Sequence, residues 1–136
     1  MLLEESVVVF DAYAWVEYAL DSPKAETVAR MLESSSEAFT PASVLAELKE
    51  SMLRHGIRRS RIRQVLTFVR SRTIVAEIDA EIAEVAGETN FRQKKKVKNW
   101  GMLDSFVLAV AAVKGGKVLT GDPHFKNMND VIYIGE

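Results

Sequence analysis

Four acidic residues in this chain have the types and positions that binding of a metal ion requires: Asp11, Glu47, Asp104 and Asp122. Carboxylates that a fold brings together repel one another unless they share a positively charged partner. The natural partner is a hard divalent cation with oxygen ligands, either Mg²⁺ or Mn²⁺. Whether these four residues can meet depends on the elements that position them.

Two of the acids follow predicted strands. Asp11 comes directly after the run from Val7 to Phe10, whose apolar residues show no alternation and so predict a strand buried on both faces. Asp122 follows the predicted strand from Lys117 to Thr120 with one glycine between. Both carboxylates are therefore expected at the carboxyl ends of strands, where open α/β sheets bind their ligands.

The other two acids belong to predicted helices. Asp104 is the only charged residue between Trp100 and Val113, at the start of a helix that is apolar on every side and therefore buried. A carboxylate there needs a partner, because burying it alone costs several kcal/mol or forces it to protonate. Glu47 falls at the edge of the apolar arc of its own helix, so it can point along the protein rather than into bulk water.

Each acid also has an ordinary interpretation. Asp11 and Asp104 are equally compatible with capping a helix. Asp122, in a Gly-Asp-Pro sequence, is more often a turn residue, and a glutamate such as Glu47 on a helix is usually a solvated charge. The combination favours a metal site, because the ordinary interpretations do not explain why three of the acids occur where a sheet and a buried helix converge.

The predicted elements alternate along the chain, which favours an α/β fold with a central, mostly parallel sheet of four to five short strands covered on both faces. The expected strands span residues 6–10, 37–39, 73–76, 117–120 and 131–134. The expected helices span residues 12–20, 23–33, 40–55, 58–70, 79–91 and 103–113. Thr40 is expected to cap the third helix, with Pro41 at its first position.

The segments VVVFDAYAW, TPASVLAELKE, MLDSFVLAVAA and VLTGDPHF resemble, in their order and approximate separation, those of PIN-domain nucleases. They are most similar to the VapC-type toxins of prokaryotic toxin–antitoxin pairs. The resemblance covers nearly the whole chain, from about Val7 to Ile134. It implies a PIN-like α/β/α sandwich, and we expect one such domain over residues 1–136.

The resemblance also implies a function. Asp11, Glu47, Asp104 and Asp122 would be the acidic quartet that binds Mg²⁺ or Mn²⁺ in an endoribonuclease, which hydrolyses RNA phosphodiesters with a metal-activated water. Thr120 matches a hydroxyl residue that supports the site in the family. The serine or threonine that often follows the first acid by two positions is Tyr13 here. The VapC resemblance further implies a homodimer and a small antitoxin protein.

Basic residues lie just upstream of Asp104, and they are candidates for guiding RNA phosphates into the site: Arg92, Lys94, Lys95, Lys96 and Lys98. A solvated loop is an equally good interpretation. Trp100, beside them, could stack on a base, although a core or interface position is favoured. His124 is near the site if Asp122 is, but a turn or surface role is favoured for it.

The charges are segregated, although the net charge is only −1. Residues 51–76 contain seven arginines and no acid. This run would bind RNA or an acidic partner, or would pair with the acids of the next helix or of a second subunit; we favour the pairing. The candidate partners in the next segment are Glu77, Asp79, Glu81 and Glu84.

Composition excludes several classes of site. The 136 residues contain no cysteine and two histidines, which excludes disulfides, thiolate metal centres and a cysteine nucleophile. No apolar run reaches the ~20 residues that a membrane helix needs. The acidic start, Met1 to Ser6, lacks the basic residues of a signal peptide. We therefore expect a cytoplasmic protein that does not bind membranes.

Competing functions differ in what they require. A haloacid-dehalogenase phosphatase needs an acid at the position of Tyr13, and a receiver domain needs paired acids and a late lysine that are not found. A P-loop NTPase is excluded because its motif does not occur. Two alternatives stay open: an RNA-processing PIN nuclease without an antitoxin, and a non-catalytic RNA-binding or scaffold module on the same fold.

Overall fold

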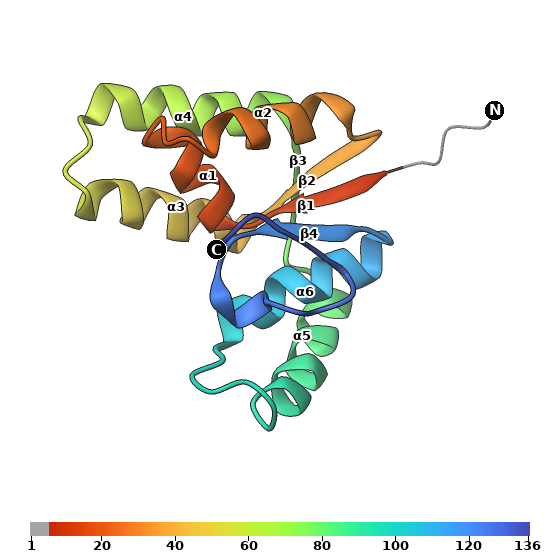
Figure 1. Ribbon diagram of the computed structural model, residues 1–136. Coiled ribbons are helices and arrows are strands. Elements are labelled where there is room, and N and C mark those ends of the chain that lie inside the picture. Colours follow the sequence, from red (N-terminus) through yellow and green to blue (C-terminus); the bar gives the residue numbers. More distant parts are fainter. Residues whose placement is uncertain (1–5) are drawn as a thin grey trace.

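The computed structural model describes residues 6–136, and five strands and six α-helices lie within them (Figure 1). The strands are β1 (Val7–Phe10), β2 (Glu37–Pro41), β3 (Ile74–Ala76), β4 (Lys117–Thr120) and β5 (Val131–Tyr133). The helices are α1 (Ala12–Ala19), α2 (Ala25–Ser34), α3 (Ala42–Arg54), α4 (Arg59–Arg72), α5 (Ala80–Gln93) and α6 (Met102–Lys114), with a short 3₁₀ turn, η1 (Pro123–Phe125). The first five residues, which the expectation about a signal peptide concerns, lie outside the described residues.

The five strands form one sheet in the order β3-β2-β1-β4-β5, and every neighbouring pair is parallel. β1 is central, and its residues Val8, Val9 and Phe10 are almost fully buried, as the uninterrupted apolar run predicts. The predicted α/β class and the parallel sheet are confirmed. Because β1 and β4 are adjacent and parallel, the residues that follow them meet at one edge of the sheet.

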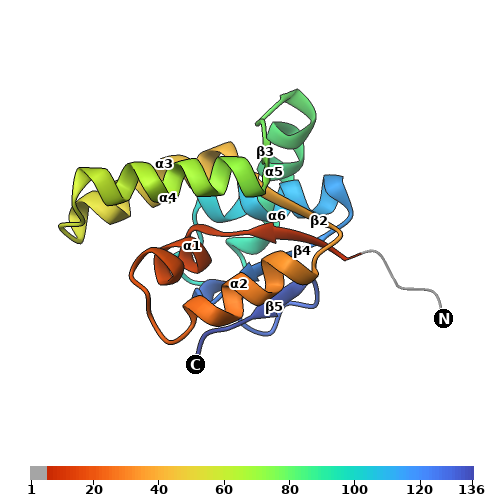
Figure 2. The same cartoon turned by 90° about the horizontal axis from the view of Figure 1, so that it is seen from above.

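Helices cover both faces of the sheet. In Figure 1, α1, α2 and α4 lie above the strands, while α5 and α6 lie below them. The hairpin of α3 and α4 projects beyond the carboxyl ends of the strands (Figure 1). In the view from above, α4 runs toward the β3 edge of the sheet, and α2 lies on the side of β5 (Figure 2). No helix among residues 6–136 combines the length and apolar character needed to cross a membrane.

A chain of hydroxyl groups crosses the core between α1, β2 and β3. The Thr73 Oγ1 hydroxyl donates to the Val69 carbonyl (2.7 Å), so the 2.8 Å bond between Thr40 and Thr73 must be donated by Thr40. Trp15, fully buried, donates from Nε1 to Thr40 Oγ1 at 3.2 Å. The polar side-chain atoms of these three residues therefore all have hydrogen-bond partners, which is what burial requires.

The same contacts explain one wrong prediction. Thr40 and Pro41 were expected to open a helix, but both belong to β2, and α3 begins at Ala42. Thr40 directs its hydroxyl into the core instead of toward a helix terminus, so tertiary hydrogen bonds replace the capping role. Pro41 is the residue before the helix and makes no side-chain cap. Elsewhere the predicted elements are confirmed to within a few residues, and Asp79 caps α5 by accepting from the Ile82 backbone N–H.

Candidate active site

The carboxyl ends of β1 and β4 place two aspartates side by side in the fold. Asp11 directly follows β1, and its backbone N–H continues the pairing with β4 by donating to the Leu119 carbonyl at 3.1 Å. Asp122 follows β4 after Gly121 and precedes η1. Asp11 precedes α1 but makes no side-chain cap there, so the capping interpretation of this residue is not supported.

The first turn of α6 supplies a third carboxylate. Asp104 lies at the third position of α6, where its Oδ2 accepts a hydrogen bond from the Gly101 backbone N–H at 3.2 Å. The capping role considered for Asp104 is therefore present, but it occupies only one of the two carboxylate oxygens.

Helix α3 supplies the fourth acid. Its residues Val44, Leu48 and Met52 are buried, which is the apolar arc that the spacing predicts. Glu47 is half-buried at the edge of this arc. It therefore faces the rest of the protein rather than bulk solvent.

All four acids line one cleft of about 730 Å³. Its other walls come from α1, α3 and the first turn of α6, and they include the apolar side chains Val16 and Leu103 and the charged residues Glu17 and Arg54. The sequence predicted that these acids would gather round a shared cation at the point where the elements that carry them meet. The structure brings them together at that point.

Burial and mutual repulsion change the protonation of two of these acids. Desolvation raises the pKa of Asp11 from 3.8 to about 6, with smaller contributions from the charges of Asp104 and Asp122, while the Thr120 hydrogen bond opposes the rise. Desolvation also raises the pKa of Glu47 from 4.5 to about 7, and the charges of the three aspartates add to this effect. Perturbed pKa values of this kind in a cleft are typical of functional sites.

Thr120 connects two of the acids. Its fully buried hydroxyl donates to Asp11 Oδ2 at 2.8 Å and accepts from the Asp122 backbone N–H at 3.0 Å. The supporting position that the family resemblance gives to Thr120 is thus occupied by a hydrogen-bonded hydroxyl. Tyr13 also lines the cleft, and its ring lies where a Cβ on Gly121 would be, so only glycine fits there.

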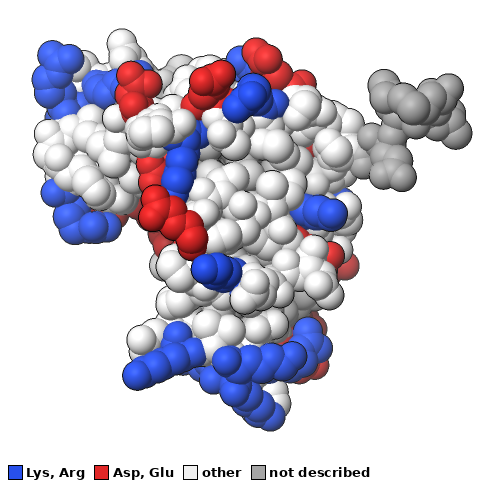
Figure 3. Space-filling model, viewed as in Figure 1, with Lys and Arg blue, Asp and Glu red and all other residues white. Residues whose placement is uncertain are grey.

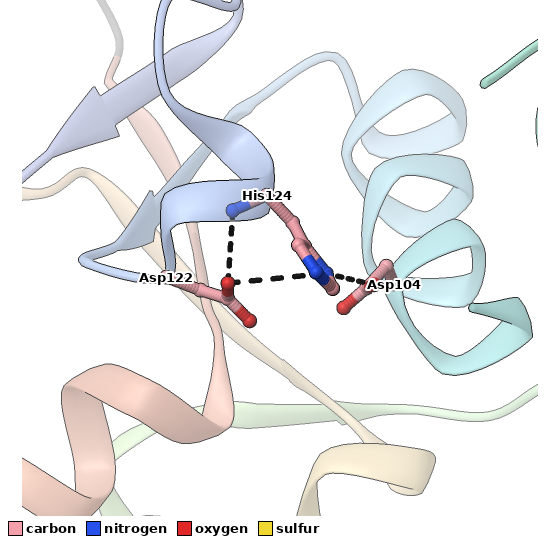
Figure 4. A group of neighbouring side chains, drawn as sticks. All are labelled: Asp104, Asp122 and His124. Carbon is pink, nitrogen blue, oxygen red and sulfur yellow. Dashed lines mark hydrogen bonds and ion pairs between the residues drawn. The ribbon is translucent and has the colours of Figure 1, made fainter. Parts of the chain in front are cut away.

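His124, for which the sequence favoured a turn or surface role, lies in the site. Its Nδ1 lies 2.9 Å from Asp104 Oδ2 and 3.9 Å from Asp122 Oδ1 (Figure 4). The only signal in the sequence was its position two residues after Asp122. Nothing in the sequence indicated that η1 would pack its imidazole against the N-terminus of α6.

The donor atoms fit Mg²⁺ or Mn²⁺. Asp104, Asp122 and His124 each offer one ligand atom, and these atoms lie within 4.8 Å of one another. Two of these atoms are carboxylate oxygens, and Asp11 and Glu47 add further carboxylates to the same cleft. Hard divalent cations prefer such oxygen ligands. The repulsion that raises the pKa of Asp11 and Glu47 is what a bound cation would relieve.

Comparison with known families decides what kind of protein this is. The family model described as PIN domain matches residues 8–131. The chain belongs to the PIN domain family. This PIN domain contains all four acids within the matched region, and its family membership supports nuclease activity in general. No curated protein sequence matches the chain.

Solved structures share the fold of this PIN domain. A chain of the VapBC2 complex from Rickettsia felis, bound to a DNA fragment from its promoter, has a TM-score of 0.73 and 16% identity, covering 95% of this chain and 98% of that one. A toxin–antitoxin complex from Klebsiella pneumoniae has a TM-score of 0.71 and 16% identity, over 92% and 95% of the two chains. Mycobacterium tuberculosis VapC20, a toxin that cleaves the sarcin–ricin loop, has a TM-score of 0.67 and 18% identity, over 90% and 91%.

The lysine-rich segment of this PIN domain lies outside the cleft. It forms the turns between α5 and α6, and all five of its cationic side chains are exposed: Arg92, Lys94, Lys95, Lys96 and Lys98. Figure 3 shows basic side chains gathered at the lower end of the molecule, under the sheet. This segment leads directly into α6, the helix that carries Asp104.

The structure confirms a core position for Trp100. Trp100 is 2% exposed and donates from Nε1 to Ser105 Oγ at 2.7 Å, so it is a core residue and not a base-stacking one.

Of the seven arginines of residues 51–76, only Arg54 forms an ion pair with a carboxylate of the described residues, and its partner is Glu50 of its own helix. Pairing with the acids that follow β3 is therefore not found within residues 6–136, while pairing with the acids of a second subunit stays a prediction.

Proposed function

We propose that this PIN domain is an Mg²⁺- or Mn²⁺-dependent endoribonuclease and the toxin of a toxin–antitoxin pair. The observation that supports this most directly is the cleft in which Asp11, Glu47, Asp104 and Asp122 meet. A scaffold has no need for four acids at one point, since their mutual repulsion destabilises the fold. A nuclease needs them to hold a cation against the phosphate of its substrate.

Each acid has a proposed role. Asp11 and Asp104 would hold the ion, and Glu47 and Asp122 would complete the site directly or through water. When bound, the ion would lower the pKa of a coordinated water and neutralise charge on the phosphoryl oxygens. Glu47 would accept the proton of the attacking water at its carboxylate, because a pKa of about 7 suits a general base at neutral pH.

Thr120 and the lysine-rich segment would support the reaction from outside the ion's ligands. Thr120 holds Asp11 in its ionised form by donating to Oδ2. The exposed cations from Arg92 to Lys98 would attract RNA phosphates through sequence-independent electrostatics. Because RNA is the proposed substrate, the proposal also places the protein in the cytoplasm.

An antitoxin and a second copy of the chain are the proposed protein partners. The antitoxin is supported by the toxin–antitoxin complexes among the structures that share the fold. A homodimer is supported by exposed apolar side chains where α5 ends and α6 begins, namely Phe91 (62% exposed), Met102 and Leu103 (46% each). Light scattering of the wild type and of Phe91→Glu tests the dimer, which the charged variant should weaken.

Incubation of the purified protein with a pool of cellular RNA tests the activity. New RNA ends should form with Mg²⁺ or Mn²⁺ and should be absent with a chelator. Mapping those ends identifies the cleaved sequences. RNA that binds to the protein but stays intact with either ion would contradict the nuclease and favour the scaffold alternative.

A further inference from the structure

His124 lies between two of the proposed ion-binding carboxylates and contacts both. Its imidazole Nδ1 is 2.9 Å from Asp104 Oδ2, and its backbone N–H donates to Asp122 Oδ1 at 2.9 Å. Figure 4 shows the ring between the two aspartates, which come from opposite sides of the cleft, α6 and the end of β4. One residue therefore fixes two acids that are 18 positions apart in the sequence, at 104 and 122.

In each aspartate, one carboxylate oxygen accepts hydrogen bonds from the protein and the other does not. Asp104 Oδ2 accepts from both His124 and the Gly101 backbone N–H, whereas Oδ1 accepts from no donor within residues 6–136. Asp122 Oδ1 accepts from the His124 backbone, and its Oδ2 likewise has no donor in that part of the chain. Hydrogen bonds to one oxygen orient the carboxylate, and so fix the direction in which the other oxygen can bind a ligand.

The acceptor determines the state of the imidazole. A carboxylate oxygen cannot donate, so Nδ1 must carry the proton in the bond to Asp104. A protonated ring nitrogen cannot bind a cation at the same time. The cleft also offers enough carboxylate oxygens for a hard ion, so a nitrogen ligand is not needed.

We infer that His124 is a positioning residue that orients Asp104 and Asp122 so that their free oxygens face the same ion. This inference rests on the proposed function, because it concerns the same ion site. The alternative, that His124 itself is a ligand of the ion, uses the same atom, Nδ1, and predicts a different outcome for each measurement below.

Equilibrium binding of Mn²⁺, without RNA, separates these possibilities. His124→Ala removes the donor and should weaken Mn²⁺ binding about tenfold to a hundredfold, the usual effect of losing an outer-shell partner. His124→Asn places an amide N–H near the position of Nδ1 and should restore most of the affinity. Glu84→Gln, at an exposed position of α5 outside the cleft, should bind Mn²⁺ like the wild type. Thermal unfolding without metal shows whether each variant is folded.

Spectroscopy of bound Mn²⁺ gives an independent result. Pulsed electron paramagnetic resonance of the wild-type complex should show no coupling to a directly ligated imidazole nitrogen. In RNA cleavage, His124→Ala should need more metal for half-maximal rate yet approach the wild-type rate at saturating metal.

Three outcomes would overturn the inference. Wild-type Mn²⁺ affinity in folded His124→Ala would show that the contact has no positioning role. A directly coupled imidazole nitrogen that disappears in His124→Asn would make His124 a ligand. A wild-type protein that binds no Mn²⁺ would overturn the proposed function as well, whereas the first two outcomes leave that function intact.

Discussion

Thr120 and Asp11 are 109 positions apart in the sequence, yet the threonine hydroxyl donates a 2.8 Å hydrogen bond to the aspartate in the core of the site. The same hydroxyl accepts from the backbone of Asp122 at 3.0 Å. The bond favours the ionised form of Asp11 and so limits the rise of its pKa, which burial brings to about 6. The Thr120 side chain therefore both positions the Asp11 carboxylate and favours its ionised form.

Replacing Thr120 with valine keeps its shape and removes the hydroxyl. A hydrogen bond to a charged group contributes about 1.5–3 kcal/mol, so the pKa of Asp11 should rise by roughly one to two units. Mn²⁺ binding requires the ionised acid, and the pH below which binding weakens should move upward by the same amount. Titrations of Mn²⁺ affinity against pH measure this shift. Thr67→Val, at an exposed position of α4, is the control; a profile for Thr120→Val that matches it would refute the assigned role.

The raised pKa of Asp11 predicts how stability depends on pH. In the folded, metal-free protein this pKa is about 6, above the 3.8 of the unfolded chain. The folded state therefore loses stability as pH rises from about 4 to about 7, where the buried acid must ionise. Asp11→Asn removes that cost, and at about pH 7.5 it should be more stable than the wild type by about 2–3 kcal/mol.

Chemical denaturation in a chelator, at about pH 4 and about pH 7.5, tests this prediction. The advantage of Asp11→Asn should fall to about 0.5 kcal/mol at the lower pH, because the acid is then protonated in the folded state and only partly ionised in the unfolded chain. Glu84→Gln, exposed on α5, should match the wild type at both pH values. An Asp11→Asn protein that is less stable than the wild type at the higher pH would contradict the desolvation account.

Metal should offset the stability that the wild type lacks relative to Asp11→Asn. A ligand present at a hundredfold excess over its dissociation constant adds about 2.7 kcal/mol to the free energy of unfolding. Mn²⁺ should therefore raise the melting temperature of the wild type and leave that of Asp11→Asn nearly unchanged. Differential scanning calorimetry at fixed pH measures both shifts. Equal shifts in the two proteins would mean that the ion binds elsewhere.

Most of the fold follows from local patterns in the sequence. The apolar run before Asp11 predicts a strand buried on both faces, and the uniformly apolar residues 106–113 predict a buried helix. The order of these elements limits the sheet to a parallel arrangement. The convergence of Asp11, Asp104 and Asp122 follows from that arrangement, because they lie at two strand ends and a helix start, whereas the inward direction of Glu47 follows from its place on the apolar arc of α3.

The remaining features depend on contacts between segments that no local pattern encodes. Thr40 and Pro41 have the local signature of a helix start, but the bonds of Thr40 to Trp15 and Thr73 place them in a strand. His124 has the signature of a turn residue, and its contact with Asp104 depends on how η1 packs against α6. Tertiary packing decides both cases.

The lysine-rich segment should contribute to affinity for RNA and not to the ion site. Replacing Lys94, Lys95 and Lys96 with alanine should weaken RNA binding at low salt and reduce the slope of log affinity against log salt by about two, at ~0.7 per phosphate contact on a single strand. Mn²⁺ affinity should stay at the wild-type value. Fluorescence anisotropy over a range of salt concentrations measures the slope.

A matched removal of three positive charges elsewhere serves as the comparison. Arg58, Arg59 and Arg63 lie in the exposed arginine run at the start of α4, and their replacement with alanine should leave the slope unchanged. If this variant loses the salt dependence and the lysine variant keeps it, RNA binds along α4 and the lysine-rich segment is a solvated loop.

Cleavage of one mapped RNA substrate by the four single variants Asp11→Asn, Glu47→Gln, Asp104→Asn and Asp122→Asn tests the central claim most directly. Saturating Mn²⁺ and a single-turnover excess of enzyme restrict the measured rate to the events on the enzyme. Each variant should cleave at least about a hundredfold more slowly than the wild type, as expected when a group that stabilises the transition state is lost, while Glu84→Gln should cleave at the wild-type rate. Wild-type rates in folded Asp11→Asn and Asp104→Asn, or cleavage that persists in a chelator, would contradict the account.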